Sequence, residues 1–285
     1  MLKQRILTAA ILIPLVVYGI LNLPTLWFAY VWAAVILLGA WEWSALARTG
    51  CTWQRIAWVV VTFALLATVW IVSHDLNTAP ILIHGAALFW LFIPLLLATG
   101  PVKWLQTLSP NNYRIFASVM GFATLTFAWL SLSGLHSLLN PQNVTDAFGP
   151  KLVMYLFCIV WAADIGAYFS GKRFGRRKLA ISISPGKSWE GAIGGFIATG
   201  ILALLASRYF GYQGWSQVNF ILVSQAAAII SVYGDLFVSV FKRASGIKDS
   251  GKILPGHGGI LDRVDSTLSA APVFLSGLLL LELIR

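Results

Sequence analysis

The chain has 285 residues, of which 58% are hydrophobic and only 11% are charged. Soluble domains carry roughly 25% charged residues, so this composition excludes a soluble globular enzyme, and its 17 Phe and 13 Trp exclude a disordered chain. The net charge of +10 favours loops that face anionic lipid headgroups, and we expect no nucleic-acid partner. These numbers predict an all-α, polytopic protein of the lipid bilayer.

Apolar runs of membrane-spanning length predict about nine transmembrane helices. The first two are short and joined only by Leu23-Pro24, so they could instead form one helical hairpin. Lys3 and Arg5 precede the first run as in a signal peptide, but no clear cleavage site follows, which favours an uncleaved span. The predicted spans are 6–21, 25–41, 56–72, 80–98, 115–135, 152–169, 189–207, 218–241 and 266–284.

Basic residues predict the orientation of these spans. With a cytoplasmic N-terminus and nine alternating spans, 17 of the 20 Lys and Arg residues fall on the cytoplasmic side. Such an excess is typical of cytoplasmic loops. We therefore expect a cytoplasmic N-terminus and an extracytoplasmic C-terminus.

The chain contains no long polar segment that could form a soluble domain. We divide it into an N-terminal region, 1–150, with about five spans, and a C-terminal catalytic region, 151–285, with cytoplasmic loops 170–188 and 242–265. Six of the ten acidic residues lie between 164 and 265. Any chemistry is therefore expected at the cytoplasmic membrane face.

Two acids lie inside apolar runs, near the predicted cytoplasmic ends of their spans. An ionised side chain at the bilayer centre costs roughly 2.5–3.5 kcal/mol, so Asp164 and Asp235 need a compensating cation. That cation is either a bound metal ion or a basic side chain that ties helices together. Ser239 and Lys242 follow Asp235 at i+4 and i+7, which places all three on one helical stripe.

Two further acids, Asp262 and Asp265, are spaced i and i+3 where a helix should begin. Helix capping would account for one of them, but not for two on one face opposite Asp235. Three carboxylates with few histidines suit a hard, oxygen-preferring ion such as Mg²⁺.

Basic residues in the same region can bind anions. Lys187 precedes a predicted helix start, with Ser188 as its N-cap, and free helix amides favour phosphate. Gly186-Lys187-Ser188 is not a P-loop, because position 181, where its first glycine should stand, is Ile. A plain positive-inside patch is the alternative explanation for the basic residues from Lys172 to Lys178.

A glycine-rich connection at 248–259 can bring backbone amides close to a ligand. His257 within it could equally hold the loop together or touch a substrate. Hard-cation ligands and phosphate-binding lysines at a lipid face indicate phosphoryl or nucleotidyl transfer. A phosphate acceptor, with its second pKa near 6, would need no general base.

The C-terminal half resembles the signature of phosphatidate cytidylyltransferases (CDP-diacylglycerol synthases) of the bacterial type. The matching blocks are Ser239-Val240-Phe241-Lys242-Arg243, Lys248-Asp249 and Leu254-Pro255-Gly256-His257-Gly258-Gly259-Ile260-Leu261-Asp262-Arg263-Val264-Asp265. Upstream, Asp164 to Tyr168, Gly171-Lys172 and Ser184 to Gly191 are similar to a second region of the family. The first 150 residues match only in being apolar and multi-spanning.

The resemblance implies that CTP and phosphatidic acid are converted to CDP-diacylglycerol and pyrophosphate at the cytoplasmic face of the bacterial inner membrane. It implies Mg²⁺ as the cofactor, with room for a monovalent cation such as K⁺ beside it, and a homodimer. Asp235, Asp262 and Asp265 would hold the metal and, with Lys242, act as catalytic residues. The predicted substrate-binding residues are Lys187, Ser188, Ser239, Arg243, Lys248, Asp249, His257, Arg263 and Asp164.

Two alternatives to this function stay open from the sequence. One is another CTP-dependent membrane enzyme, such as a polyprenol kinase or an ether-lipid cytidylyltransferase. The other is an ion-coupled transporter with Asp164 and Asp235 as coupling sites, which would place charges in both halves of the chain.

Overall fold

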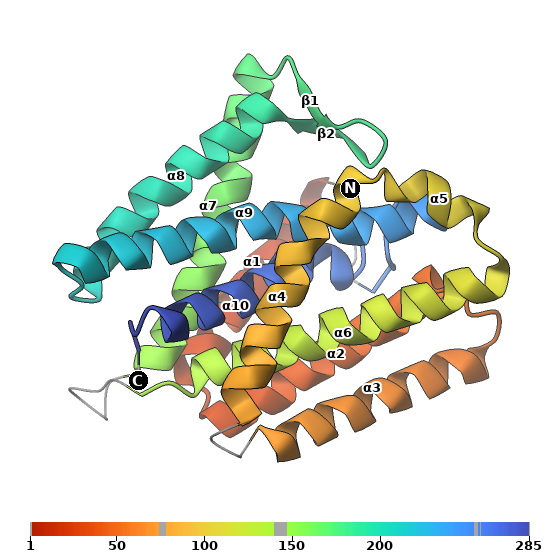
Figure 1. Ribbon diagram of the computed structural model, residues 1–285, viewed down its shortest axis with the longest axis horizontal. Coiled ribbons are helices and arrows are strands. Elements are labelled where there is room, and N and C mark those ends of the chain that lie inside the picture. Colours follow the sequence, from red (N-terminus) through yellow and green to blue (C-terminus); the bar gives the residue numbers. More distant parts are fainter. Residues whose placement is uncertain (1, 74–77, 140–146, 254–255, 257, 285) are drawn as a thin grey trace.

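The computed structural model describes residues 2–73, 78–139, 147–253, 256 and 258–284. It consists of ten helices and one small antiparallel sheet (Figure 1). The elements are α1 (Leu2–Asn22), α2 (Thr25–Leu46), α3 (Thr52–Val72), α4 (Thr78–Ala98), α5 (Pro101–Thr107), α6 (Pro110–His136), α7 (Phe148–Phe174), β1 (Lys178–Ala180), β2 (Ser184–Ser188), α8 (Trp189–Tyr209), α9 (Gly214–Ala244) and α10 (Leu261–Leu280).

The prediction of an all-α, multi-pass membrane protein is confirmed. Each predicted span falls on one long helix, and α1 and α2 are separate helices. Within the described residues, seven helices are long and apolar enough to cross a bilayer, namely α2, α3, α4, α6, α7, α8 and α9. The count of nine spans, which also needs α1 and α10, stays a prediction, as does the orientation of the N-terminus.

Two elements differ from the expected loops. The short helix α5 begins at Pro101 after Gly100, whose positive φ of 68° suits glycine. The predicted loop 170–188 contains the last turn of α7 and the β1–β2 hairpin. Strands of three and five residues are too short for a visible alternation of apolar and polar residues.

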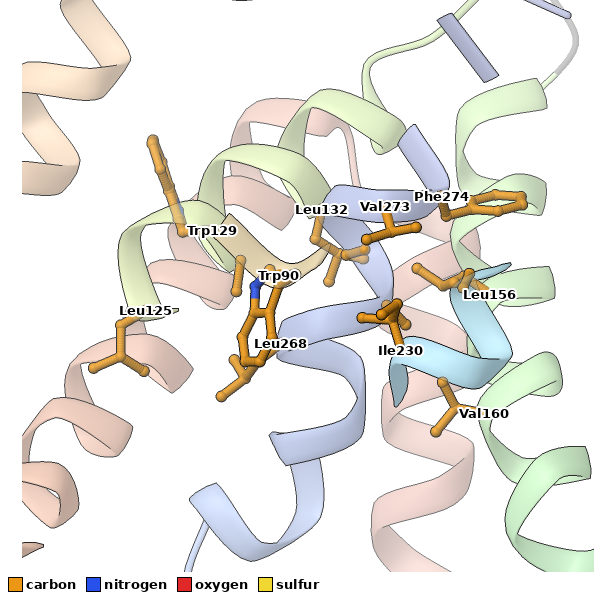
Figure 2. Close-up of a cluster of buried hydrophobic side chains, with 14 of the residues drawn as sticks. Trp90, Leu125, Trp129, Leu132, Leu156, Val160, Ile230, Leu268, Val273 and Phe274 are labelled. Atoms are coloured by element: carbon orange, nitrogen blue, oxygen red, sulfur yellow. The ribbon is translucent and has the colours of Figure 1, made fainter. Parts of the chain in front are cut away.

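Helices α9 and α10 run side by side through the middle of the molecule, with α2, α3 and α6 to one side of them and α7 and α8 to the other (Figure 1). The buried side chains of these helices form one hydrophobic cluster, in which Trp90, Leu156, Ile230, Leu268 and Phe274 meet from four helices, α4, α7, α9 and α10 (Figure 2). This core fixes α9 and α10, which carry most of the predicted site residues.

The α7–α8 pair is held together by close backbone contact at glycines. A Cβ atom at Gly191 or Gly195 would lie 2.9 and 2.7 Å from the carbonyl oxygens of Ala167 and Ala163, respectively. The small-residue spacing from Gly191 to Gly195 is thus a packing face.

The four predicted cytoplasmic connections lie at one end of the bundle. Arg48, after α2, donates to the Ala244 carbonyl at 2.5 Å, and the Tyr113 hydroxyl of α6 lies 2.8 Å from Ser245 Oγ. Arg243 Nε donates to the Ile183 carbonyl in the hairpin turn at 3.1 Å. The C-terminal end of α9 therefore joins all four connections.

Candidate active site

The candidate site begins where α9 crosses α10. A Cβ atom at Gly234 would collide with Ser269 Oγ and approach the Asp265 carbonyl oxygen, so only glycine permits this crossing. The close approach brings the neighbouring carboxylates of Asp235 and Asp265 into interaction, although they are 30 positions apart in the sequence. Asp265 is 8% exposed, and its Oδ1 accepts the Ser266 amide at 2.8 Å.

The β1–β2 hairpin places the side chain of a lysine beside Asp235. Lys187 Nζ lies 2.6 Å from Asp235 Oδ2, and both side chains are partly exposed. Asp164 of α7 interacts electrostatically with Lys187 and Asp235. Side chains of α7, β2 and α9 therefore interact electrostatically here.

A second ion pair joins α9 to α10, closer to the connection between these two helices. Lys242 Nζ lies 2.8 Å from Asp262 Oδ1, and the two side chains are 10% and 9% exposed. Ser239 Oγ donates to Asp235 Oδ1 at 3.3 Å, so the predicted helical stripe on α9 exists. Lys242 also interacts electrostatically with Asp235 and Asp265, which links the two ion pairs.

Asp262 is further bound by backbone amides. Its Oδ2 accepts the amides of Ser250 and Gly259 at 2.9 and 3.0 Å. The glycine-rich connection therefore places amides against a carboxylate of the site. Asp262 lies in the first turn of α10, where a negative charge is also favoured by the helix dipole.

The carboxylates are suited to a divalent cation by their chemistry. Asp164, Asp235, Asp262 and Asp265 carry four formal negative charges when ionised, against two positive charges from Lys187 and Lys242. The excess of carboxylates over lysines and the all-oxygen donor set fit Mg²⁺. In the described part of the chain, however, no three His, Cys, Asp or Glu side chains surround a single point. Metal ligation by Asp235, Asp262 and Asp265 stays a prediction.

The other predicted binding residues take varied positions. Ser188 is the N-cap of α8 and accepts the Gly191 amide at 3.1 Å, as predicted. Arg243 holds the hairpin turn. Lys248, Asp249 and Arg263 are exposed, and His257 lies outside the described residues. Substrate binding by these residues stays a prediction.

Two adjoining cavities open beside the Lys187–Asp235 pair, between α7, α8 and α9. The first, of about 320 Å³ and called the polar cavity below, has the charged side chains of Asp164, Lys172 and Lys187 in its lining. The second, of about 290 Å³, is lined by apolar side chains that include Ile193 and Ile229. Both are lined by Ala163, Ala167, Leu179, Ala192 and Val232. A polar compartment next to an apolar one suits an amphipathic ligand.

The sequence analysis did not identify Glu42 of α2, which is 3% exposed. Its carboxylate accepts hydrogen bonds from Ser250 Oγ and from the amides of Ile260 and Leu261. The available signal was an acidic residue between Trp41 and Trp43 at the end of an apolar run.

Comparison with known proteins identifies the family of this chain. The sequence model of the Cytidylyltransferase family matches residues 3–281. The chain is 39% identical to the phosphatidate cytidylyltransferase of Haemophilus influenzae over 287 residues, which cover 96% of this chain and 97% of the relative. It is 40% identical to that of Pseudomonas aeruginosa, over 96% of both chains, and 36% identical to that of Brucella melitensis, over 99% and 95%.

These matches extend through the N-terminal region, where the sequence resemblance had been only general. The family match covers nearly the whole length of a multi-pass membrane protein. The chain belongs to the cytidylyltransferase family.

Proposed function

We propose that this protein transfers the cytidylyl group of CTP to phosphatidic acid, which forms CDP-diacylglycerol and releases pyrophosphate. The names of the relatives support this substrate pair. The structural observation that carries the proposal is the pair of adjoining cavities beside the Lys187–Asp235 pair. A polar compartment suits phosphate groups, and the apolar compartment suits part of an acyl chain.

In the proposed reaction, an oxygen of the phosphatidate phosphate attacks the α-phosphorus of CTP. The new bond joins that oxygen to the α-phosphorus, and the bond from the α-phosphorus to the bridging oxygen breaks as pyrophosphate leaves. The attacking phosphate is largely dianionic near neutral pH, so no side chain has to remove a proton. Positioning and charge neutralisation are then the main demands on the protein.

Lysines of the site meet those demands in this proposal. Lys187 and Lys242 carry ammonium groups that neutralise phosphate oxygens and hold the reacting groups in place. Lys187 lines the polar cavity, so it is suited to the lipid phosphate. Arg243 and Lys248 are further candidates for the triphosphate.

We propose Asp235, Asp262 and Asp265 as the residues that hold Mg²⁺, with room for a monovalent cation such as K⁺ nearby. Bound Mg²⁺ would neutralise charge on the nucleotide phosphates. Between substrates, Lys187 and Lys242 offset part of the negative charge of these carboxylates.

The proposals on membrane orientation and on oligomeric state rest on the sequence and the family resemblance. We propose that the site faces the cytoplasm in a bacterial inner membrane, because the predicted nine-span topology puts 17 of the 20 basic residues on the side of the candidate site. We also propose a homodimer, which cross-linking of the purified protein would detect as a covalent pair. A monomer under all detergent conditions would contradict the dimer.

One assay tests the proposed function directly. Purified protein with labelled CTP, phosphatidate and Mg²⁺ should form labelled CDP-diacylglycerol and an equal amount of pyrophosphate. An ether-linked lipid phosphate and a polyprenol, offered separately, distinguish the alternative enzymes. Product from either lipid, with none from phosphatidate, would overturn the assignment.

A further inference from the structure

Helix α2, from the N-terminal region, contributes a buried carboxylate to the end of the molecule that carries the candidate active site. Glu42 Oε2 accepts Ser250 Oγ at 2.8 Å and the Leu261 amide at 2.9 Å, and its Oε1 accepts the Ile260 amide at 2.9 Å. Within the described residues, no Lys, Arg or His forms an ion pair with this carboxylate. Its charge is therefore compensated by these hydrogen bonds and by the N-terminus of α10.

The segments that bind Glu42 also bind Asp262. Ser250 donates its hydroxyl to Glu42 and its amide to Asp262. The amides of Gly259, Ile260 and Leu261 follow one another along the chain, and the first donates to Asp262 while the other two donate to Glu42. The two carboxylates thus share one set of donors, and the position of one constrains the position of the other.

The environment of Glu42 requires a group that only accepts hydrogen bonds. All three polar groups around it are donors, and an ionised carboxylate presents acceptors only. Glutamine would place an NH₂ group against at least one of these donors. A Cβ atom at Gly251 or Gly259 would collide with the Glu42 carboxylate, so the chain fits closely around it.

We propose that Glu42 is a positioning residue for the reaction. It binds Ser250 on one side, and Ile260 and Leu261 on the other, of the connection between α9 and α10, and it thereby orients Asp262. This inference rests on the proposed function, because it takes Asp262 to be a metal ligand. Groups that hold a metal ligand in place are typically worth 10–100-fold in metal affinity. A carboxylate that merely joined α2 to α10 would affect stability but not metal affinity in the folded protein.

Metal binding to the full-length protein in detergent tests the inference without turnover. The probe is Mn²⁺, whose free concentration is read by electron paramagnetic resonance without CTP or lipid. Glu42→Gln should raise the Kd for Mn²⁺ by about 10-fold or more. Ser250→Ala, which removes the hydroxyl bonded to Glu42 but keeps the amide bonded to Asp262, should raise it by less.

A matched control removes a buried hydrogen bond elsewhere. Thr199 donates to Gln225 Oε1 at 2.6 Å between α8 and α9, and Thr199→Val keeps the side-chain shape while it removes the hydroxyl. Its Mn²⁺ affinity should equal that of the wild type. The thermal midpoint of each variant reports whether the protein is folded.

The outcomes separate the two proposals. Wild-type protein that binds no Mn²⁺ would overturn the proposed metal site itself. Wild-type and Glu42→Gln proteins of equal affinity would overturn only the role of Glu42, as would an equal loss in Thr199→Val. If Glu42→Gln does not fold, Ser250→Ala decides: weakened Mn²⁺ binding supports the inference, and unchanged binding overturns it.

Discussion

Lys187 of the β1–β2 hairpin and Asp235 of α9 form an ion pair whose Nζ and Oδ2 atoms lie 2.6 Å apart. The pair joins a short surface hairpin to the central helices, and it lies beside the polar cavity. Asp164 also interacts electrostatically with this ammonium group. One lysine therefore offsets the charge of two carboxylates, one on α7 and one on α9.

Removal of this ammonium group should abolish most of the activity. Lys187→Gln leaves Asp164 and Asp235 without their shared cation and removes a proposed phosphate contact. We expect kcat/KM to fall by about 10²-fold or more, as when one positioned charge-stabilising group is lost. Steady-state kinetics of the purified variant measure this. Lys178→Gln, an exposed position in the same hairpin, is the control and should retain activity. Equal activity of the two variants would contradict the proposed role.

Asp262→Asn should remove activity while the protein stays folded. The substitution weakens the pair with Lys242 and places an amide where two backbone amides already donate. We expect turnover to fall by about 100-fold or more, measured as CDP-diacylglycerol formation, with the thermal midpoint recorded in parallel. Glu282→Gln, exposed after α10, should retain full activity. Near-normal turnover in Asp262→Asn would exclude Asp262 as a metal ligand.

The crossing of α9 and α10 should tolerate no side chain at Gly234. A Cβ atom there would collide with Ser269 Oγ, and such overpacking costs about 1–3 kcal/mol. Gly234→Ala should therefore lower the thermal midpoint and separate Asp235 from Asp265. Gly85→Ala in α4 is the matched control, because its added Cβ meets no atom within 4 Å. Two equal midpoints would show that α9 and α10 can move apart freely.

The sequence was sufficient to predict the fold class and to show which polar side chains share one face of α9. Long apolar runs locate the helices, and helical spacing places Asp235, Ser239 and Lys242 on one face. The N-cap at Ser188 was also predictable, because its hydroxyl acts on an amide only three residues away. Local periodicity and local chemistry decide these features.

Contacts between distant segments were not predictable in the same way. Glu42 lies 208 positions from Ser250, and no spacing rule connects them. The carboxylates of Asp235 and Asp265 meet because Gly234 permits a close helix crossing, which a hydrophobic pattern does not encode. Arg243 Nε donates to the Ile183 carbonyl, a contact that depends on an unpredicted hairpin.

The apolar cavity gives a prediction about the lipid substrate alone. Ala228 of α9 lines this cavity but not the polar one. Ala228→Leu would fill part of the volume proposed for an acyl chain, so the KM for phosphatidate should rise. The KM for CTP, measured on the same preparation, should not change and is the internal control. A rise in both constants, or in neither, would contradict a lipid site in this cavity.

The orientation in the membrane can be tested independently of catalysis. Reporter fusions within 140–148 should behave as extracytoplasmic and fusions within 176–180 as cytoplasmic, since the basic residues around β1 favour the inner side. Segment 176–180 lies at the end of the bundle that carries Lys187, so its location also fixes the side of the candidate active site. Alkaline phosphatase and green fluorescent protein fusions report opposite sides, and each site should be positive with one reporter only. The reverse pattern would place the acids and lysines outside the cytoplasm, where no CTP is available, and would refute the proposed function.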